Sequence, residues 1–286
     1  MIILALKDGL GNQLFQYAAA RALAKSLNTK LLLDISSFKY NKVRKYSLCH
    51  FQIQANIASD LQISLFRLVT RVFNLINYKN RSRKLRFNFS SIDYAPLIGT
   101  VQRNAWIEGY WQSEKYFHSI EELIRHEFVV ISPINAYCAD MLKLIKNTNS
   151  VSLHIRRGDY VNDAIVHSIH GVCSLDYYIN AIKLILLNVE SPLIFVFSDD
   201  IEWVKNNLLV DTVQFVYVDD DKRTDYDDLR MMYSCKHNII SNSSFSWWGA
   251  WLNSFADKIV IAPKKWVNHT HENPDILPEK WLQIDP

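Results

Sequence analysis

The feature that most constrains the fold is a regular alternation of apolar runs and helical patterns from Val151 onward. The apolar runs predict buried strands, and the segments between them carry apolar residues at helical spacing. Strands that alternate with helices are typical of a parallel sheet with helical crossovers. The expected strands are 151–155, 193–197, 214–218, 238–241 and 258–262, and the expected helices are 175–189, 201–208, 225–234 and 245–254.

The start of the chain shows the same alternation. An apolar run at 2–6 is followed by a loop with Gly9 and Gly11, a helical pattern, and a second apolar run at 30–34. This order predicts a βαβ unit. We therefore expect an α/β protein with two Rossmann-like domains facing each other across a cleft, namely 1–147 and 148–286, with the boundary at the polar segment 147–150.

Composition limits the function classes. A length of 286 residues suits about two domains, and the net charge of +3 is too small to indicate nucleic-acid binding. No apolar run approaches the ~20 residues of a membrane span, and the first residues lack the basic leader of a signal peptide. The four cysteines are scattered, as is typical of reduced thiols, so we expect a cytoplasmic protein.

The middle of the chain is basic. Between Asp60 and Asp93 there are seven Lys and Arg residues and no acidic residue. One interpretation is a solvated basic helix and loop. The other is peripheral association of Arg67–Arg86 with the anionic inner face of a membrane, because basic clusters bind anionic lipid weakly but additively.

Two arginines and a carboxylate follow the strand expected at 151–155. Arg156, Arg157, Gly158 and Asp159 stand where that strand leaves the sheet, which is where open α/β sheets bind ligands. Adjacent guanidinium groups suit a bound polyphosphate, and an Arg–Asp ion pair that closes a loop is the structural alternative.

A second polar group follows the strand expected at 238–241. Asn242, Ser243, Ser244 and Ser246 crowd the start of a helix, whereas a single cap residue would satisfy that helix end. Their hydroxyl and N–H groups predict a phosphate cradle. The tryptophans that follow are expected to anchor the helix in the core.

Other segments leave their interpretations open. Asp199 or Asp200 caps the next helix or holds a ribose, a guanine edge or a metal. The acidic residues 219–221, 225, 227 and 228 form a cluster that complements the dipole of the helix it opens or forms an Asp-x-Asp metal site, and the first interpretation is favoured. Residues 109–117 form an amphipathic surface helix or contribute to a carbohydrate pocket. His167 and His170 lack further metal ligands nearby in sequence.

Taken together, the segments at 9–13, 109–117, 154–160, 198–200 and 241–252 resemble the bacterial α-1,2-fucosyltransferases of glycosyltransferase family 11. The resemblance runs in order from residue 1 to about 270. It is carried mainly by His-x-Arg-Arg-x-Asp at 154–159 and by Asn-Ser-Ser-Phe-Ser-Trp-Trp-Gly at 242–249. It implies a GT-B fold, a GDP-β-L-fucose donor, inversion to an α-1,2-linked galactoside, and no required metal or other cofactor.

The resemblance also implies roles for individual residues. His154, Arg156 and Asp159 are the expected catalytic group, with Arg156 neutralising the leaving diphosphate. Together with the motifs above, it gives the expected donor-binding residues Gly11, Asn12, Gln13, Arg157, Asp199, Asn242, Ser243, Ser244, Phe245 and Ser246. Tyr110, Trp111 and Gln112 are the expected acceptor residues.

Several alternatives remain open at this point. Asp8, Asp159 and Asp163 are equal candidates for the general base. The expected partners are GDP-fucose and a galactose-containing oligosaccharide or lipid-linked glycan, with no nucleic acid. The competing functions are a non-catalytic GDP- or glycan-binding module, or a transferase of another nucleotide sugar.

Overall fold

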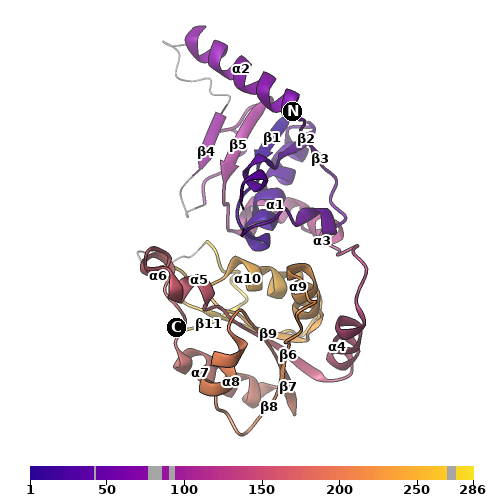
Figure 1. Cartoon of the computed structure of the whole chain (residues 1–286), viewed down its shortest axis with the longest axis vertical. Coiled ribbons are helices and arrows are strands. Elements are labelled where there is room, and N and C mark those ends of the chain that lie inside the picture. The colour runs from indigo at the N-terminus through magenta and orange to yellow at the C-terminus, as the bar shows by residue number, and fades with distance from the viewer. Residues whose placement is uncertain (42, 77–85, 90–93, 269–274) are drawn as a thin grey trace. The chain divides into compact units, whose positions relative to one another are not determined.

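The computed structural model describes residues 1–41, 43–76, 86–89, 94–268 and 275–286, without the side chains of 71–76, 89, 159, 162 and 166 (Figure 1). The chain divides into two compact units, Met1–Ile131 (unit 1) and Ser132–Pro286 (unit 2). Each unit is an α/β body with its own parallel sheet.

The described strands of unit 1 form one sheet in the order β3-β2-β1-β5-β4, in which every pairing is parallel. The strands are β1 (Ile2–Ala5), β2 (Leu31–Asp34), β3 (Asn56–Ile57), β4 (Arg86–Phe89) and β5 (Ala105–Gly109). The helices are α1 (Leu10–Ser26), α2 (Asp60–Ile76) and α3 (Glu121–Glu127), with short 3-10 turns at Ser36–Lys39, Leu48–His50, Glu114–Tyr116 and His118–Ile120. The predicted βαβ unit is thus confirmed.

The described strands of unit 2 form a second parallel sheet in the order β11-β10-β9-β6-β7-β8. The strands are β6 (Asn149–Ile155), β7 (Pro192–Ser198), β8 (Gln214–Tyr217), β9 (His237–Ile239), β10 (Val260–Pro263) and β11 (Leu282–Ile284). The helices are α4 (Ala136–Lys146), α5 (Gly158–Asn162), α6 (Ala164–His170), α7 (Leu175–Asn188), α8 (Ile201–Asn207), α9 (Asp225–Ser234) and α10 (Ser244–Leu252).

The core of unit 2 lies on both faces of its sheet. Alternate residues of β7 enter different clusters, since Val196 packs with α7 and α8 whereas Phe195 and Phe197 pack with α4 and α9. Burial on both faces explains why these strands are continuous apolar runs. The helices α4, α7, α8, α9 and α10 all begin at residues whose side chains accept a first-turn N–H: Asn135, Ser174, Asp200, Thr224 and Ser243.

The division between the units differs from the expected boundary at 147/148. Helix α4 precedes that position, yet its Cys138 and Ile145 are buried against β7 and α9. Because these contacts belong to the second sheet, the compact units divide at Ile131 and Ser132.

The basic middle segment is helical in its first part. Helix α2 covers Asp60–Ile76, while residues 77–85 and 90–93 of the expected basic loop lie outside the described residues. In the described part of the chain, no helix has both the length and the apolar character needed to cross a membrane.

Candidate functional site

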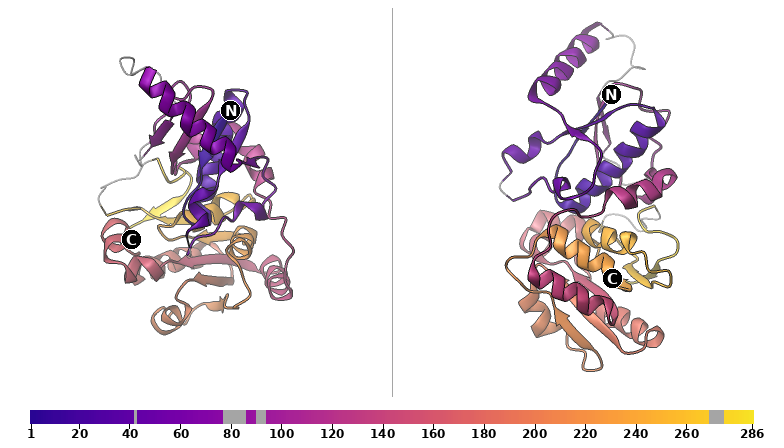
Figure 2. Two further views of the ribbon diagram at one scale, coloured as in Figure 1. Left: turned by 45° about the horizontal axis from the view of Figure 1, so that its top comes forward. Right: turned by 90° about the vertical axis from the view of Figure 1, so that its right-hand side faces the viewer.

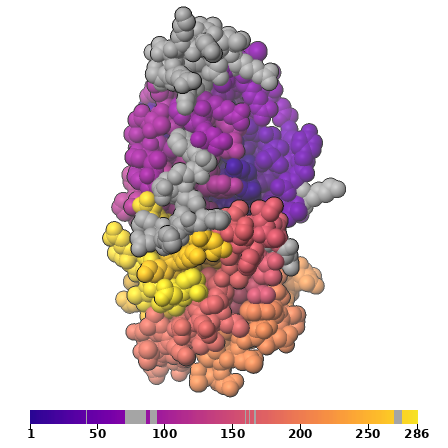
Figure 3. All heavy atoms as spheres, turned by 90° about the vertical axis from the view of Figure 1, so that its left-hand side faces the viewer, coloured from indigo at the N-terminus to yellow at the C-terminus, as the bar shows by residue number. Residues whose placement is uncertain are grey.

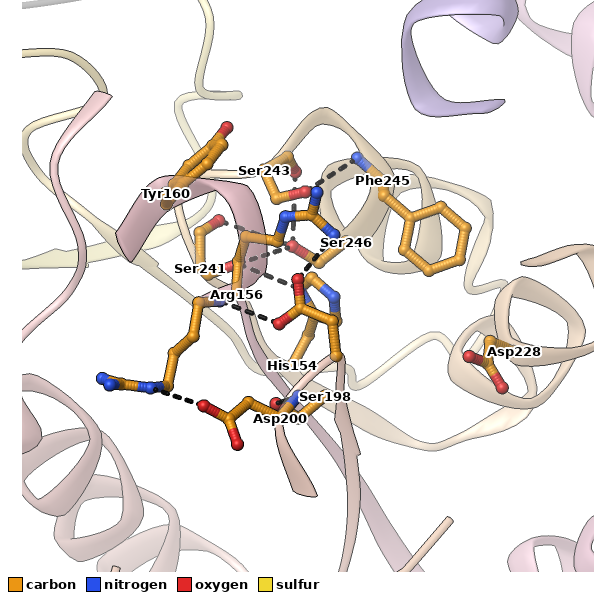
Figure 4. Close-up of polar contacts among 12 residues, drawn as sticks. His154, Arg156, Tyr160, Ser198, Asp200, Asp228, Ser241, Ser243, Phe245 and Ser246 are labelled. Carbon is orange, nitrogen blue, oxygen red and sulfur yellow. Dashed lines mark hydrogen bonds and ion pairs between the residues drawn. The ribbon is translucent and has the colours of Figure 1, made fainter. Parts of the chain in front are cut away.

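The strand order of unit 2 reverses between β6 and β9. The chain runs from β6 outward to β7 and β8, and then returns to the other side of β6 for β9 and β10. The segments after β6 and β9 therefore leave the sheet toward opposite faces, and open parallel sheets bind ligands at such a point. There the Nδ1 atom of His154 lies 2.9 Å from the Oγ atom of Ser241. The two motifs predicted from sequence thus meet at one edge (Figure 4).

The two arginines after β6 have different environments. The Arg156 guanidinium pairs with the Asp199 carboxylate at 2.8 Å, and Figure 4 shows its side chain directed toward the start of α10. Arg157 instead pairs with Asp200 at 3.3 Å and lies over the Trp203 ring at 3.5 Å. Arg157 is therefore held against α8, while Arg156 lies at the switch point.

Asp199 holds the turn that carries both arginines. One of its carboxylate oxygens pairs with Arg156, and the other accepts the backbone N–H of Arg157 at 2.9 Å. The ion pair expected as the structural alternative thus exists, with Asp199 as its acid. The side chain of Asp159, the acid that stands next to the two arginines in sequence, lies outside the described residues.

Gly158 provides space for the Asp199 carboxylate, because a Cβ atom at position 158 would overlap it. We expect Gly158→Ala to displace Asp199 and, with it, the Arg156 guanidinium. A misplaced catalytic group of this kind lowers rates by about 10²-fold or somewhat less, so kcat/KM for sugar transfer should fall by ~10–100-fold. Steady-state kinetics with purified protein measures this loss.

The control for this prediction is a double-mutant cycle with Asp199→Ala. If Gly158→Ala acts by displacing the Asp199 carboxylate, it should lower kcat/KM little further in a protein that already carries Asp199→Ala. Full additivity of the two losses would contradict the proposed contact.

Small polar residues surround the first turn of α10. The Ser243 hydroxyl accepts the Phe245 N–H at 3.3 Å, and the Ser246 hydroxyl lies 3.5 Å from that of Ser241. Ser241 and Ser246 are buried, while Ser244 is half-buried. The N–H groups of a first helical turn have no partner within the helix, and the dipole there favours anions. This arrangement suits the phosphate cradle predicted from the sequence.

Asn242 faces the protein interior. Its side-chain amide donates to the carbonyl oxygens of His170 at 2.9 Å and Trp266 at 3.3 Å. The backbone of Asn268, after β10, also donates to Ile169 at 2.8 Å, so α6 lies beside this segment (Figure 3). Asn242 therefore fixes the loops that flank the cradle.

His154 is neutral in the folded protein near pH 7. Its side chain is buried, and its ring packs edge-on against Phe245 with centroids 5.7 Å apart. Burial lowers the pKa of the imidazole to about 4, and the positive charge of Arg156 acts in the same direction, against the opposing effect of Asp199. Because the ring is neutral, the positive charge at the end of β6 comes from Arg156 and Arg157.

The pKa of His154 gives a pH prediction. The unfolded chain binds a proton near pH 6.5 and the folded chain only near pH 4, so stability falls as the pH drops through this window. The full difference corresponds to about 3 kcal/mol. Asp228, whose pKa burial raises to about 6, has the opposite effect at pH 4–6.

A comparison with His154→Gln isolates the effect of the histidine. The unfolding free energy of the wild type, measured by urea titration, should decline relative to that of the variant as the pH falls from 6.5 to 4. A difference that stays constant over this range would mean that His154 is not buried in its neutral form.

Sequence reasoning gave the acidic residues of α9 a structural role and missed a second polar pair at the same edge. Arg223 pairs with Asp228 at 2.5 Å and donates to the Ser198 carbonyl at 3.4 Å, at the end of β7. The Asp228 side chain is 16% exposed, but its other carboxylate oxygen is buried and has no hydrogen-bond partner in the described structure. A buried unpartnered acceptor at a ligand-binding edge is a signal that only the structure provides.

The acidic residues before α9 make contacts within the protein. Asp219 pairs with Lys205 at 3.4 Å, and Asp220 accepts the Lys222 N–H at 2.7 Å. Across the described ranges of the chain, no three His, Cys, Asp or Glu side chains are grouped as metal ligands. The structural role that the sequence favoured for the acidic cluster applies to Asp225, Asp227 and Asp228, which lie in the first turn of α9.

Unit 1 has its own switch point, between β1 and β5. Here residues predicted to bind the sugar donor lie beside residues predicted to bind the acceptor substrate. The Gln112 side chain donates a hydrogen bond to the Asn12 side chain at 2.7 Å, and the Tyr110 hydroxyl donates one to the Asp8 carboxylate at 2.7 Å. Burial, followed by the hydrogen bond to Asp8, raises the pKa of the Tyr110 phenol, which therefore stays protonated. Asp8 has a left-handed backbone with φ 65°, a conformation that in non-glycine residues clusters at functional sites.

The remaining predicted residues of unit 1 are buried. Gln13 links its loop to the carbonyl oxygens of Asp8 and Lys45, both at 2.8 Å. Gly11 lies inside α1, and Trp111 is a buried residue with φ 49°. The segment after Gly109 is a loop with short 3-10 turns, so the helix considered for 109–117 is wrong. Strand β5 ends at Gly109, so Tyr110 and Gln112 follow its carboxyl end.

Comparisons with known proteins agree with this architecture. The model of "Glycosyl transferase family 11" matches residues 1–285. An "Alpha-1,2-colitosyltransferase" of Escherichia coli is 36% identical over 100% of this chain and 99% of its own length. The "O-antigen biosynthesis glycosyltransferase WbnK" of Escherichia coli is 31% identical over 98% and 99% of the two chains. A "Galactoside alpha-(1,2)-fucosyltransferase 1" of Lagothrix lagotricha is 25% identical over 89% of this chain and 66% of that protein.

Solved structures share the fold at low identity. The Bradyrhizobium α-1,6-fucosyltransferase NodZ matches with TM-score 0.52 and 15% identity, over 88% of this chain and 91% of that one. A mutant of Arabidopsis thaliana FUT1 matches with TM-score 0.59 and 10% identity, over 96% and 72%. These likenesses confirm the expected GT-B fold class. Because one family model matches residues 1–285 and two relatives are 36% and 31% identical over nearly all of their length, the chain belongs to glycosyl transferase family 11.

Proposed function

We propose that the chain transfers L-fucose from GDP-β-L-fucose to the 2-hydroxyl of a galactoside, with inversion to an α-1,2 linkage and without a metal. The observation that carries the proposal is the placement of Arg156 beside the first turn of α10, at the switch point of the unit 2 sheet. The names of the α-1,2-colitosyltransferase and the galactoside α-(1,2)-fucosyltransferase support the linkage and the class of sugar.

In this mechanism the bond between the fucosyl C1 and the β-phosphate oxygen breaks, and its electron pair leaves with GDP. Positive charge develops on the sugar ring, and negative charge develops on the diphosphate. Arg156 and the N–H and hydroxyl groups at the start of α10 stabilise the diphosphate in place of a metal. Each hydrogen-bond donor of this kind changes the rate by about 10²–10³-fold.

The acceptor hydroxyl attacks C1 from the opposite face, and its proton leaves late in the reaction. Asp8, Asp159 and Asp163 remain the candidates for receiving that proton. Asp8 already accepts a hydrogen bond from Tyr110. Asp163 holds the start of α6 by accepting the Ile165 N–H at 2.9 Å.

We assign the guanine base of the GDP-sugar to the edge of the unit 2 sheet beside Asp228. A guanine ring carries N–H donors side by side on its Watson–Crick edge, and a carboxylate with an unpartnered oxygen accepts from such a pair. Uracil has only one donor on that edge. The chain should therefore bind GDP more tightly than UDP.

A second donor sugar is favoured by a specific observation. The 36% identical relative is named for colitose, which is fucose without its 3-hydroxyl. The roles proposed for Arg156 and the start of α10 are the same for GDP-colitose, because its diphosphate and its reacting carbon are those of GDP-fucose.

The test is a screen of donors and acceptors with linkage analysis of the product. The purified chain is incubated with GDP-fucose, GDP-colitose or GDP-mannose and with lactose or an O-antigen fragment ending in galactose. GDP release and an α-1,2-linked fucosyl product are expected, unaffected by EDTA. Turnover with GDP-colitose alone would move the donor assignment to colitose, whereas GDP binding without turnover on any acceptor would favour a non-catalytic module.

A further inference from the structure

The Tyr160 side chain contacts both polar segments that meet at the switch point of unit 2 (Figure 4). The guanidinium carbon of Arg156 lies over its ring, 5.6 Å from the centroid, and its hydroxyl donates to the Asn242 carbonyl at 3.4 Å. Helix α5 starts directly after the two arginines, and its Val161 N–H donates to the Arg157 carbonyl at 2.8 Å. Because one helical turn takes about four residues, residue 160 returns beside residue 156.

Helix α6 holds the Tyr160 ring. Helices α5 and α6 pack against each other, in the pink part of unit 2 in Figure 2. The Tyr160 ring stacks on the His170 ring, with centroids 4.9 Å apart and an angle of 10° between the planes. The backbone carbonyl of Tyr160 also accepts a hydrogen bond from Nδ1 of His167 at 2.8 Å. These contacts restrict rotation of the ring, so it offers Arg156 a surface of defined orientation.

The contact with Asp199 leaves the plane of the Arg156 guanidinium to be set by other groups. That ion pair joins one nitrogen to one carboxylate oxygen at 2.8 Å, and both side chains are partly exposed. An ion pair between partly exposed side chains contributes little, and an arginine side chain has considerable rotamer freedom to lose. A guanidinium within about 6 Å of an aromatic centroid is attracted to the face of the ring. The Tyr160 ring therefore limits the orientations that the guanidinium adopts.

We propose that Tyr160 is a positioning residue for Arg156, whose ring orients the guanidinium toward a diphosphate at the start of α10. The inference rests on the leaving-group role of Arg156 proposed above, and it adds the group that orients Arg156 before the ligand binds. A side chain that is already oriented loses less freedom on binding. Loss of the ring should therefore weaken binding of the diphosphate and leave binding of the nucleoside unchanged.

Isothermal titration of the full chain with GDP and with guanosine tests this inference. Tyr160→Leu removes the aromatic face and should weaken GDP binding about three- to tenfold, as expected for loss of a cation–π contact at a partly exposed site. Guanosine should bind this variant like the wild type. Tyr160→Phe keeps the face and should stay within about twofold of the wild type, because the hydroxyl contact at 3.4 Å is long for a hydrogen bond.

Tyr217→Leu is the matched control. Tyr217 also lies under a cation, Lys205 at 5.7 Å, but it stands at the end of β8, two strands away from β6 in the sheet. This variant should bind GDP like the wild type. Circular dichroism checks that all variants keep the fold.

A double-mutant cycle with Arg156→Ala separates positioning from a general effect on the fold. Tyr160→Leu should weaken GDP binding little further in a protein that already carries Arg156→Ala. Additive losses would overturn the inference, as would an equal loss of guanosine affinity in Tyr160→Leu or an equal loss of GDP affinity in Tyr160→Phe. Wild-type GDP affinity in Tyr160→Leu, together with a weakened Arg156→Ala variant, would overturn this inference alone. Wild-type GDP affinity in Arg156→Ala would overturn the leaving-group role and this inference with it.

Discussion

Replacing Arg156 with alanine is expected to lower kcat for sugar transfer by about 10²–10³-fold while the protein stays folded. The guanidinium is held by Asp199 at the end of β6, beside the first turn of α10. It would act on the charge that develops on the leaving diphosphate, so its removal raises the barrier more than it weakens binding of the donor ground state. Single-turnover kinetics with GDP-fucose measures the chemical step directly.

Arg125→Ala is the control for this prediction. Arg125 also pairs with a carboxylate, Glu121 at 2.9 Å, but the pair lies one turn apart on helix α3 of unit 1. Pairs of this kind contribute only a few tenths of a kcal/mol to stability. The control should therefore turn over like the wild type. Wild-type turnover by the Arg156 variant would contradict the leaving-group role.

The largest effect on stability is expected for Trp247→Ala. Trp247 is fully buried, its ring stacks on that of Trp251, and its Nε1–H donates to the Ile276 carbonyl at 2.7 Å. Removing a buried tryptophan costs about 3–5 kcal/mol for the cavity and lost contacts. The Ile276 carbonyl also loses its donor. Urea unfolding followed by circular dichroism measures the change.

A graded series gives this prediction its control. Trp247→Phe should lose less unfolding free energy than Trp247→Ala, because the phenyl ring fills most of the cavity and only the N–H group that bonds Ile276 is lost. Leu187→Ala, at an exposed position of the same unit, should change stability by less than about 0.5 kcal/mol. A loss under ~1 kcal/mol for Trp247→Ala would mean that the tryptophans do not anchor α10.

Much of unit 2 was predictable from the sequence for one physical reason. A strand buried on both faces must be apolar along its whole length, so β6 and β7 appear as continuous apolar runs. The core role of the tryptophans in α10 is confirmed for a similar reason, because the helix is buried almost all round. Short exposed strands give no such signal. The two residues of β3 and most of β11 are exposed, and neither strand was predicted.

The site was only partly predictable from the sequence. The motifs of Arg156 and Ser243 were identified, because residues after buried strands gather at one sheet edge. Which carboxylate holds Arg156 could not be found, since Asp199 is 43 positions from Arg156 and its approach depends on the β6–β7 register. Asp228 was identified only as one acid of a cluster with a structural role, because its pairing with Arg223 and its unpartnered oxygen are visible only in the structure.

The central claim is that the switch point of unit 2 binds the diphosphate of a GDP-sugar through Arg156. Isothermal titration of wild type and Arg156→Ala with GDP and with guanosine tests it most directly. The wild type should bind GDP, and the variant should lose at least about tenfold in GDP affinity, as expected for a charge-assisted contact. Guanosine, which has no phosphate, should bind both proteins equally. Equal affinity of the two proteins for GDP would contradict the assignment.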